Sequence, residues 1–271
     1  MHPGSYPGLA FETYAERPGV STSMLKRFAE APAKARFGVW KETPALARGS
    51  LVHTAVLEPH TLEQRYQVTD LERRGTKAWA AEEEEAAGRA LVKRADFEVA
   101  LRMRDAVLAH PIAAAVLTPA AEIERSLWWI DPETGLLCKG RPDVIRRDMK
   151  VIADVKTAAS ASPEDFRWAT IRNRYALQEA RYRAGIAATE GWEPEGFIFL
   201  VVEKEEPFLT AAYEISPSDL RAAEDQAAAL LRRWKDCETA EAAGADPREA
   251  WPGYPTNLMT LDLAPSAQMV A

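Results

Sequence analysis

Two aspartates and a lysine near the middle of the chain have the types and spacing for metal-assisted chemistry on a phosphate. Asp143 precedes Asp154 along the chain, and Lys156 follows Asp154 by two positions. Two carboxylates can hold a hard divalent cation through oxygen ligands. Side chains alternate along a strand, so Asp154 and Lys156 are expected on one face. There the ammonium could stabilise charge on a phosphate or hold an attacking water molecule.

The Asp-x-Lys tripeptide alone is a weak signal, because a surface salt bridge is its commoner meaning. Here, however, the charges of Asp154 and Lys156 end an apolar strand pattern, and active sites of α/β proteins gather at strand ends. Gly140 and Pro142, just before Asp143, suit a bulge or an irregular strand edge. If the two strands pair, the turn between them brings Asp143 and Asp154 side by side.

Other candidates have a structural alternative beside a functional one. Glu124 could face the metal cavity from a neighbouring strand, or be an ordinary strand residue. His53 follows Gly49 in an apolar helical setting and could be a metal ligand, although a lone histidine is more often structural. Gln178 and Tyr182 are four apart, hence on one helix face. That pair could orient a phosphate or a base, or simply pack the helix.

The surrounding pattern predicts helices separated by short groups of strands. A helix begins after Ser21, Thr22 and Ser23, which supply an N-cap. Three strands, expected at 124–130, 136–145 and 150–156, form a β-meander. The remaining elements predicted from periodicity are helices at 48–58, 82–109, 163–190 and 216–239 and strands at 197–202 and 209–215.

This order predicts a single α/β domain with a central mixed β-sheet flanked by helices. Residues 1–18 are interpreted as an irregular N-terminal lead-in and residues 19–242 as the domain. Residues 243–271 are expected to be an irregular segment that packs on the domain or trails from it. Neither an internal repeat nor a dividing linker is visible in the 271 residues.

Composition excludes several classes of protein. Cys138 and Cys237 are the two cysteines, too few for a disulfide framework or a four-cysteine metal site. No apolar run approaches the ~20 residues of a membrane span, and the first residues do not have the pattern of a signal peptide. A cytoplasmic protein without a membrane partner is therefore expected. The net charge of −7 argues against a nucleic-acid coat protein but not against an enzyme with a local basic groove.

Taken together, the candidate site residues and their order along the chain resemble the PD-(D/E)XK nuclease superfamily. Within it they are most similar to the RecE-type exodeoxyribonuclease VIII domain of phages and prophages. The resemblance extends over roughly residues 20 to 260. The second acid of the family signature is Asp154 here, where glutamate is commoner, but RecE-like members use aspartate there as well. The ordered motifs that carry it are Ser21–Lys26, Gly49–His53, Leu57–Pro59, Glu124–Ser126, Thr134–Gly135, Cys138–Asp143, Asp154–Thr157, and Gln178 with Tyr182.

The resemblance implies a restriction-endonuclease-like core and a role for each site residue. Asp143 and Asp154 would bind Mg²⁺, for which Mn²⁺ could substitute, with the carbonyl of Val155 as a further ligand. His53 would be an additional ligand, and Glu124 an acid that supports the ligands or binds a second metal. Lys156 would position water and stabilise the transition state. The residues expected to contact DNA are Gln178, Tyr182, Arg141, Lys77 and Trp79.

The Lys77 and Trp79 expectation concerns a segment, residues 73–79, read as a loop at the DNA entrance. In one interpretation it is mobile and Trp79 stacks on an unpaired base. In the other it is an exposed loop with a half-buried tryptophan.

The resemblance also implies an activity: 5′-to-3′ digestion of linear double-stranded DNA ends, leaving 3′ overhangs for a RecT-like single-strand annealing partner. Relatives of this type form toroidal homo-oligomers, in which only the inner face need be basic. The alternatives are an endonuclease of the same superfamily, a non-catalytic DNA-end-binding module, and a hydrolase of small phosphoesters. A Cas4-like nuclease is rejected because it would need four cysteines for an iron–sulfur cluster.

Overall fold

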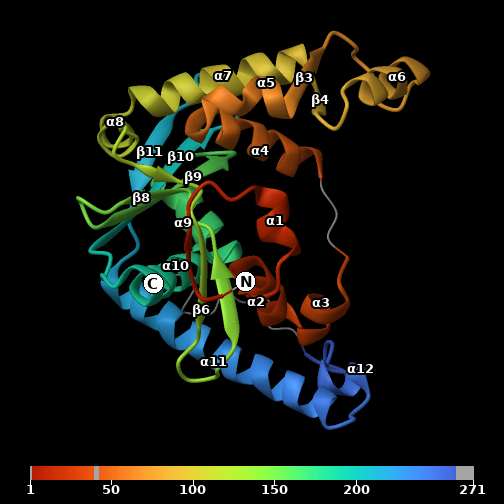
Figure 1. Cartoon of the computed structure of the whole chain (residues 1–271), viewed down its shortest axis with the longest axis vertical. Helices are drawn as coiled ribbons and strands as arrows, with labels where there is room; N and C mark the ends of the chain where they lie inside the picture. Colours follow the sequence, from red (N-terminus) through yellow and green to blue (C-terminus); the bar gives the residue numbers. More distant parts are fainter. Residues whose placement is uncertain (1, 40–42, 261–271) are drawn as a thin grey trace.

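Five strands form the mixed sheet at the centre of the computed structural model, which describes residues 2–39 and 43–260. Their order is β11-β10-β9-β8-β5, with β9 and β10 parallel and the other neighbours antiparallel. The helices around this sheet confirm the expected fold class (Figure 1). The strands are β5 (Glu122–Ile123), β8 (Val144–Arg146), β9 (Val151–Ala158), β10 (Gly196–Glu203) and β11 (Thr210–Tyr213).

The central strand β9 contributes side chains to two separate cores. Ile152 packs in one core, whereas Ala153 and Val155 pack in the other, as the alternation of a strand requires. Helices α4 (Pro44–Leu57) and α7 (Arg94–Ala109) supply the second core. Helices α10 (Tyr175–Glu190) and α11 (Pro217–Ala242) supply the first. The sheet is therefore covered on both faces.

A second sheet, of four strands, packs against α10. Its order is β1-β6-β7-β2. Gly185 lets α10 approach this sheet, because a Cβ there would lie 2.9 Å from the ring of Trp129. Helix α10 thus lies between the two sheets and fixes their relation. The strands are β1 (Gly4–Tyr6), β2 (Val20–Ser21), β6 (Ser126–Ile130) and β7 (Leu137–Gly140).

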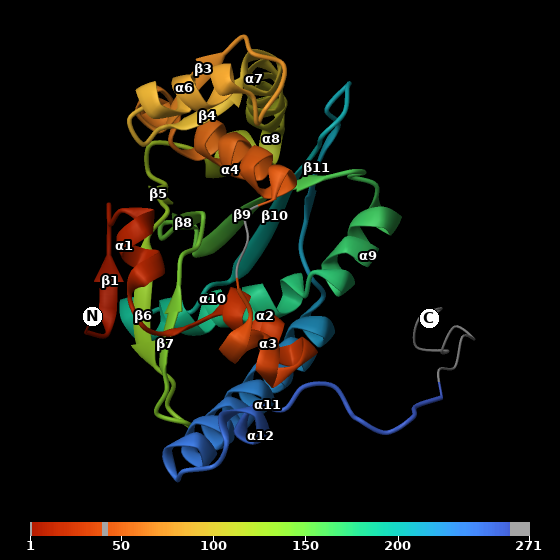
Figure 2. The same ribbon diagram turned by 90° about the vertical axis from the view of Figure 1, so that its right-hand side faces the viewer.

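A small lobe projects beyond α4 and α7, at the top of the molecule in Figures 1 and 2. Strands β3 (Tyr66–Thr69) and β4 (Ala90–Lys93) pair in parallel there, and α6 (Lys77–Glu85) connects them. The other elements are α1 (Phe11–Glu16), α2 (Thr22–Glu30), α3 (Pro32–Phe37), η1 (Pro59–Thr61), α5 (Leu62–Arg65), α8 (Pro111–Val116), α9 (Pro163–Arg172) and α12 (Pro247–Ala250).

The β-meander expected over residues 124–156 is wrong, because its strands belong to two sheets. The strand expected at 136–145 divides into β7 and β8, and residues 141–143 cross from one sheet to the other. Pro142 has no N–H to donate to a ladder, which favours the break. Glu124, expected within a strand, lies between β5 and β6 with a left-handed φ of 50°.

Two expected helices are also broken. The helix at 163–190 is α9 followed by α10, interrupted where Arg174 adopts φ 51°. The helix at 82–109 is the end of α6, then β4 and α7; Gly88, with φ 90°, lies in the connection. Glu82–Glu85 therefore ends α6 and does not form a first turn.

The terminal segments contain more structure than expected. Residues 2–18 include β1 and α1, and Lys139 holds this segment by donating hydrogen bonds to the carbonyls of Tyr14, Ala15 and Arg17. The C-terminal segment includes α12, while its residues 261–271 lie outside the described part of the chain. None of the helices described is both long and apolar enough to cross a membrane.

Candidate active site

Asp143 and Asp154 lie side by side because β8 and β9 are antiparallel. Val144 pairs with Ala153, so Asp143, the residue before β8, lies opposite Asp154 in the middle of β9. The backbone N–H of Val155 donates a 2.8 Å hydrogen bond to Asp143 Oδ2. Both carboxylates are buried, with Asp154 1% exposed. The hairpin therefore fixes the relation of the two acids through the main chain.

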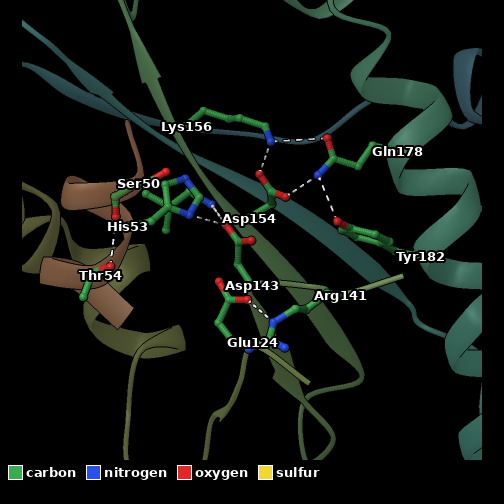
Figure 3. Close-up of polar contacts among 11 residues, drawn as sticks. Ser50, His53, Thr54, Glu124, Arg141, Asp143, Asp154, Lys156, Gln178 and Tyr182 are labelled. Carbon is green, nitrogen blue, oxygen red and sulfur yellow. Dashed lines mark hydrogen bonds and ion pairs between the residues drawn. The ribbon is translucent and has the colours of Figure 1, made fainter. Parts of the chain in front are cut away.

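Two further residues, distant from each other in the sequence, lie beside Asp143 (Figure 3). His53, on α4, places Nδ1 3.4 Å from Asp143 Oδ2. Glu124 donates its backbone N–H to the Asp143 carbonyl at 3.0 Å. One ligand atom from each of His53, Glu124 and Asp143 lies within 4.8 Å of the others. These three residues form a group that could hold a metal ion.

Arg141 positions Glu124. Its Nε donates to Glu124 Oε2 at 2.6 Å, and one terminal nitrogen donates to the Leu9 carbonyl and to Ser126 Oγ, both at 2.8 Å. Arg141 is buried, and its guanidinium is directed into the protein. These contacts tie Glu124 to the N-terminal segment.

On the other side of Asp154 lies a polar cluster formed by Lys156, Gln178 and Tyr182 (Figure 3). Gln178 Nε2 donates to Asp154 Oδ1 at 2.6 Å and approaches the Tyr182 hydroxyl at 3.4 Å. Lys156 forms an ion pair with Asp154 Oδ2. Period-two alternation on β9 places the lysine and the aspartate together, as the sequence indicated.

Burial and mutual repulsion control protonation in the site. Burial, and then the charge of Asp154, raise the pKa of Asp143 well above its usual range. Burial, and then Asp143, raise the pKa of Glu124 to about 7. Burial lowers the pKa of His53, which favours the neutral imidazole that binds metals. Crowded carboxylates with raised pKa values gain from a bound cation.

Lys156 remains an ammonium in this setting. Burial acts to lower its pKa, but the carboxylates of Asp154 and Asp143 outweigh burial and raise the pKa above its usual value. A protonated lysine beside the acids is suited to a developing negative charge.

The residues fit a divalent cation. Carboxylate oxygens and a neutral imidazole are established metal ligands. Asp154 Oδ2 is buried and contacts the ammonium of Lys156. A carboxylate oxygen has two lone pairs, so this contact leaves one of them for a metal.

Of the residues expected to contact DNA, the structure gathers only some at this site. Gln178 and Tyr182 belong to it, whereas Arg141 supports Glu124 from inside. Lys77 and Trp79 lie in the small lobe, where the expected loop is in part a helix because Thr76 caps α6 by accepting from the Trp79 N–H. Trp79 is only 4% exposed, so neither loop interpretation describes it.

Lys26 was not expected at the site, although it ends the motif Ser21–Lys26. In the structure its ammonium donates to Gln178 Oε1 at 3.2 Å. A lysine on an amphipathic helix gives no signal in the sequence that distinguishes a site residue from a surface residue.

A family model described as "PDDEXK-like domain of unknown function (DUF3799)" matches residues 21–247. Among solved structures, the chain resembles a "putative exonuclease" from Eubacterium rectale with a TM-score of 0.60 and 17% identity, over 85% of this chain and 87% of that one. A phage related exonuclease from Haemophilus somnus 129PT matches with a TM-score of 0.36 and 12% identity, over 85% and 99%. Of these two similarities, the first, with the higher TM-score, is the one that shows a shared fold. No curated protein matches by sequence.

Proposed function

We propose, from the finding that this chain belongs to the family of PDDEXK-like domains described as DUF3799, that it is a metal-dependent deoxyribonuclease. Within that class we propose a 5′-to-3′ exonuclease on linear double-stranded DNA ends. The observation that carries the proposal is the arrangement around Asp154. A group of potential metal ligands lies on the Asp143 side, and a protonated lysine lies on the other.

His53, Asp143 and Asp154 would hold the cation, with Glu124 as a further acid and the Val155 carbonyl as an expected ligand. We propose Mg²⁺, with Mn²⁺ as a substitute, since carboxylate oxygens dominate the set. When bound, the ion would neutralise phosphate charge and lower the pKa of a water molecule. Mg²⁺ and Mn²⁺ are distinguished from other ions by comparing metal-dependent activity.

The chain's own residues account for the other requirements of phosphodiester hydrolysis. Lys156 would donate to a phosphate oxygen or to the attacking water, because its raised pKa keeps it protonated. Gln178 holds Asp154 through a 2.6 Å hydrogen bond, which keeps one carboxylate oxygen turned toward α10. Asp154 Oδ2 remains beside Lys156. The site thus combines orientation with preorganised charge.

An open groove supports the proposal of a DNA substrate. Its volume is about 690 Å³, and it begins at the N-terminal end of α4, the helix that carries His53. Cations outnumber acids along it, as a phosphate backbone would require. The lining residues are Pro44, Arg48, Glu72, Arg73, Arg74, Lys93 and Asp96.

The finer features remain part of the proposal and rest on the resemblance to the RecE-type domain. They are the generation of 3′ overhangs, a RecT-like single-strand annealing partner, and a homo-oligomer in the form of a toroid. A basic inner face would let a chain of net charge −7 surround DNA.

The test uses linear duplex DNA labelled at the 5′ or the 3′ end, with Mg²⁺ or EDTA, beside a covalently closed circle. The proposal expects Mg²⁺-dependent release of the 5′ label, with the circle intact. Cutting of the circle would instead indicate an endonuclease. Firm end-binding without cutting would indicate a non-catalytic module.

A further inference from the structure

Two lysines from different elements contact the same amide oxygen at the edge of the site. Lys26, on α2, donates to Gln178 Oε1 at 3.2 Å, and Lys156, on β9, donates to it at 3.3 Å. Both ammonium groups also face the ring of Tyr175, at 5.1 and 4.6 Å from its centroid. An amide oxygen with two lone pairs can accept both bonds. It cannot neutralise two positive charges.

Positive charge is in excess around Lys26. Burial, then the ammonium of Lys156, lower the pKa of Lys26 to about 7, and Arg174 lowers it further while Asp154 acts in the opposite direction. Asp154 is already paired with Lys156. Lys26 has no ion pair with a carboxylate among the residues that the structure describes. Such a cluster of cations favours an anion between them.

The start of α10 adds to this charge. The helix begins at Tyr175 and its N-cap residue, Arg174, makes no side-chain capping hydrogen bond. The N-terminus of a helix carries partial positive charge and free N–H groups. Lys26, Lys156, Arg174 and this helix end therefore surround one region beside Asp154.

We propose that Lys26 is a second phosphate-binding lysine, whose ammonium contacts a non-bridging oxygen of the phosphodiester that Lys156 also contacts. Two ammonium groups that touch one oxygen are close enough for one phosphate group to reach both. The inference rests on the proposed function for the identity of the phosphate, which is that of the DNA strand being cut. Lys26 would then touch the substrate directly.

A positioning role is the competing explanation. Lys26 could serve only to hold the Gln178 amide with its oxygen toward the lysines and its nitrogen toward Asp154. The two roles differ in a measurable way. A lysine that binds phosphate releases a counterion from DNA, whereas a lysine that only orients Gln178 does not.

The test compares Lys26→Met, Lys26→Gln and Lys26→Arg with Arg27→Met as a matched control. Arg27 is the next residue on α2, so its replacement removes one positive charge from the same helix but on a different face. Binding of labelled linear duplex DNA is measured in EDTA over a series of salt concentrations at pH 6, where Lys26 is mostly protonated. Thermal melting shows which variants fold, and Lys26→Gln serves if Lys26→Met does not.

We expect the neutral Lys26 variants to lower the slope of log affinity against log salt by about 0.9, the value for one phosphate contact on duplex DNA. Lys26→Arg and Arg27→Met should keep the slope of the parent protein. In Mg²⁺, single-turnover cleavage by Lys26→Met should fall roughly 10²-fold, with partial recovery in Lys26→Arg.

An unchanged slope in both neutral variants would overturn the inference. This holds even if cleavage falls, since that result indicates orientation of Gln178. A parent protein that binds DNA without cutting it would contradict the proposed function, while the salt slope would still test Lys26. A parent protein that neither binds nor cuts DNA would contradict both.

Discussion

At the residue scale, Asp143 is the acid whose charge the folded protein tolerates least without a cation. Its pKa is raised by burial and by Asp154, so the ionised form is disfavoured in the folded state. A folded-state pKa above the unfolded value means that stability is lost as pH rises through this range. The buried charge of Asp143 therefore costs stability in the metal-free protein, and a bound cation would offset that cost.

Asp143→Asn should therefore stabilise the metal-free protein at pH 8. The amide oxygen can still accept the hydrogen bond from the Val155 N–H, while the buried charge disappears. We expect a rise in Tm of roughly 2–4 °C in EDTA, corresponding to about 1 kcal/mol for a protein of this size. Thermal melting in EDTA provides the measurement, and a lower Tm for the variant would contradict this explanation of the site.

Metal ions should make the parent protein more stable than Asp143→Asn. A ligand that binds only the folded state stabilises it by an amount that grows with its concentration, about 2.7 kcal/mol at 100 times Kd. Mg²⁺ or Mn²⁺ should raise the Tm of the parent protein and raise that of Asp143→Asn much less. Equal shifts in the two proteins would mean that the ion does not bind at Asp143.

The raised pKa of Glu124 predicts in which direction the stability of the protein changes with pH. Its pKa is raised from the ordinary 4.5 to about 7, so its stabilising contribution increases as pH falls from about 7 toward 4.5. In EDTA, Glu124→Gln should be more stable relative to the parent protein at pH 8 than at pH 5. Chemical denaturation at the two pH values measures this difference. If the stability of Glu124→Gln relative to the parent protein is instead greater at pH 5 than at pH 8, the Glu124 pKa is not raised.

At the element scale, the link between β7 and β8 determines how the N-terminal segment supports the site. Arg141 lies on this link and connects Glu124, Ser126 and the carbonyl of Leu9. The sequence motif suggested a DNA contact for Arg141, but the structure directs its donors inward. Its side chain thus couples α1, the four-stranded sheet and Glu124.

Arg141→Met should destabilise the protein without changing the salt slope of DNA binding. Its loss breaks a partly buried ion pair with Glu124 and the hydrogen bonds to Ser126 and Leu9, which costs up to about 3–5 kcal/mol. Denaturant unfolding measures the loss, and binding in EDTA measures the slope. A stable variant with a reduced salt slope would indicate that Arg141 contacts DNA, as the sequence suggested.

The elements that the sequence predicted well are those governed by local pattern. The alternation along β9 and the short turn before it place Asp143, Asp154 and Lys156 together. The breaks at residues 141–143 and at Arg174 depend on which sheet each strand joins and on how α10 packs between the sheets. Gly185 against Trp129 is such a tertiary constraint, and no local period reveals it.

The site residues follow the same division. Gln178 and Tyr182 could be placed on one helix face from their spacing. Lys26 could not be placed, because its contact with Gln178 joins residues 152 positions apart. Trp79, in contrast, was expected at the site but is not part of it. Its position near arginines suggested base stacking, but the side chain is buried in the small lobe, and the Arg74 guanidinium lies 5.2 Å from its ring.

At the scale of the whole molecule, charge is distributed unevenly. The chain has a net charge of −7, yet Arg48, Arg73 and Arg74 line one groove near the N-terminal end of α4. In the proposed nuclease this basic groove would attract the phosphate backbone of DNA. The groove is lined by residues of α4, α7 and the small lobe, and α4 also carries His53.

Replacing Arg73 and Arg74 together with glutamate should weaken DNA binding while leaving the metal-induced rise in Tm unchanged. The effect should be stronger at low salt, because screening reduces interactions between exposed charges. Binding measured at two salt concentrations checks this expectation. Unchanged affinity at low salt would place the DNA path elsewhere on the molecule.

The most direct test of the central claim compares Lys156→Ala with the parent protein in Mg²⁺-dependent digestion of end-labelled linear duplex DNA. Lys156 is the cation beside Asp154, and its removal leaves His53, Glu124 and Asp143 in place. We expect a loss of roughly 10²–10³-fold or more in cleavage rate, with the fold retained by circular dichroism. Full activity in a correctly folded Lys156→Ala protein would contradict the proposed active site.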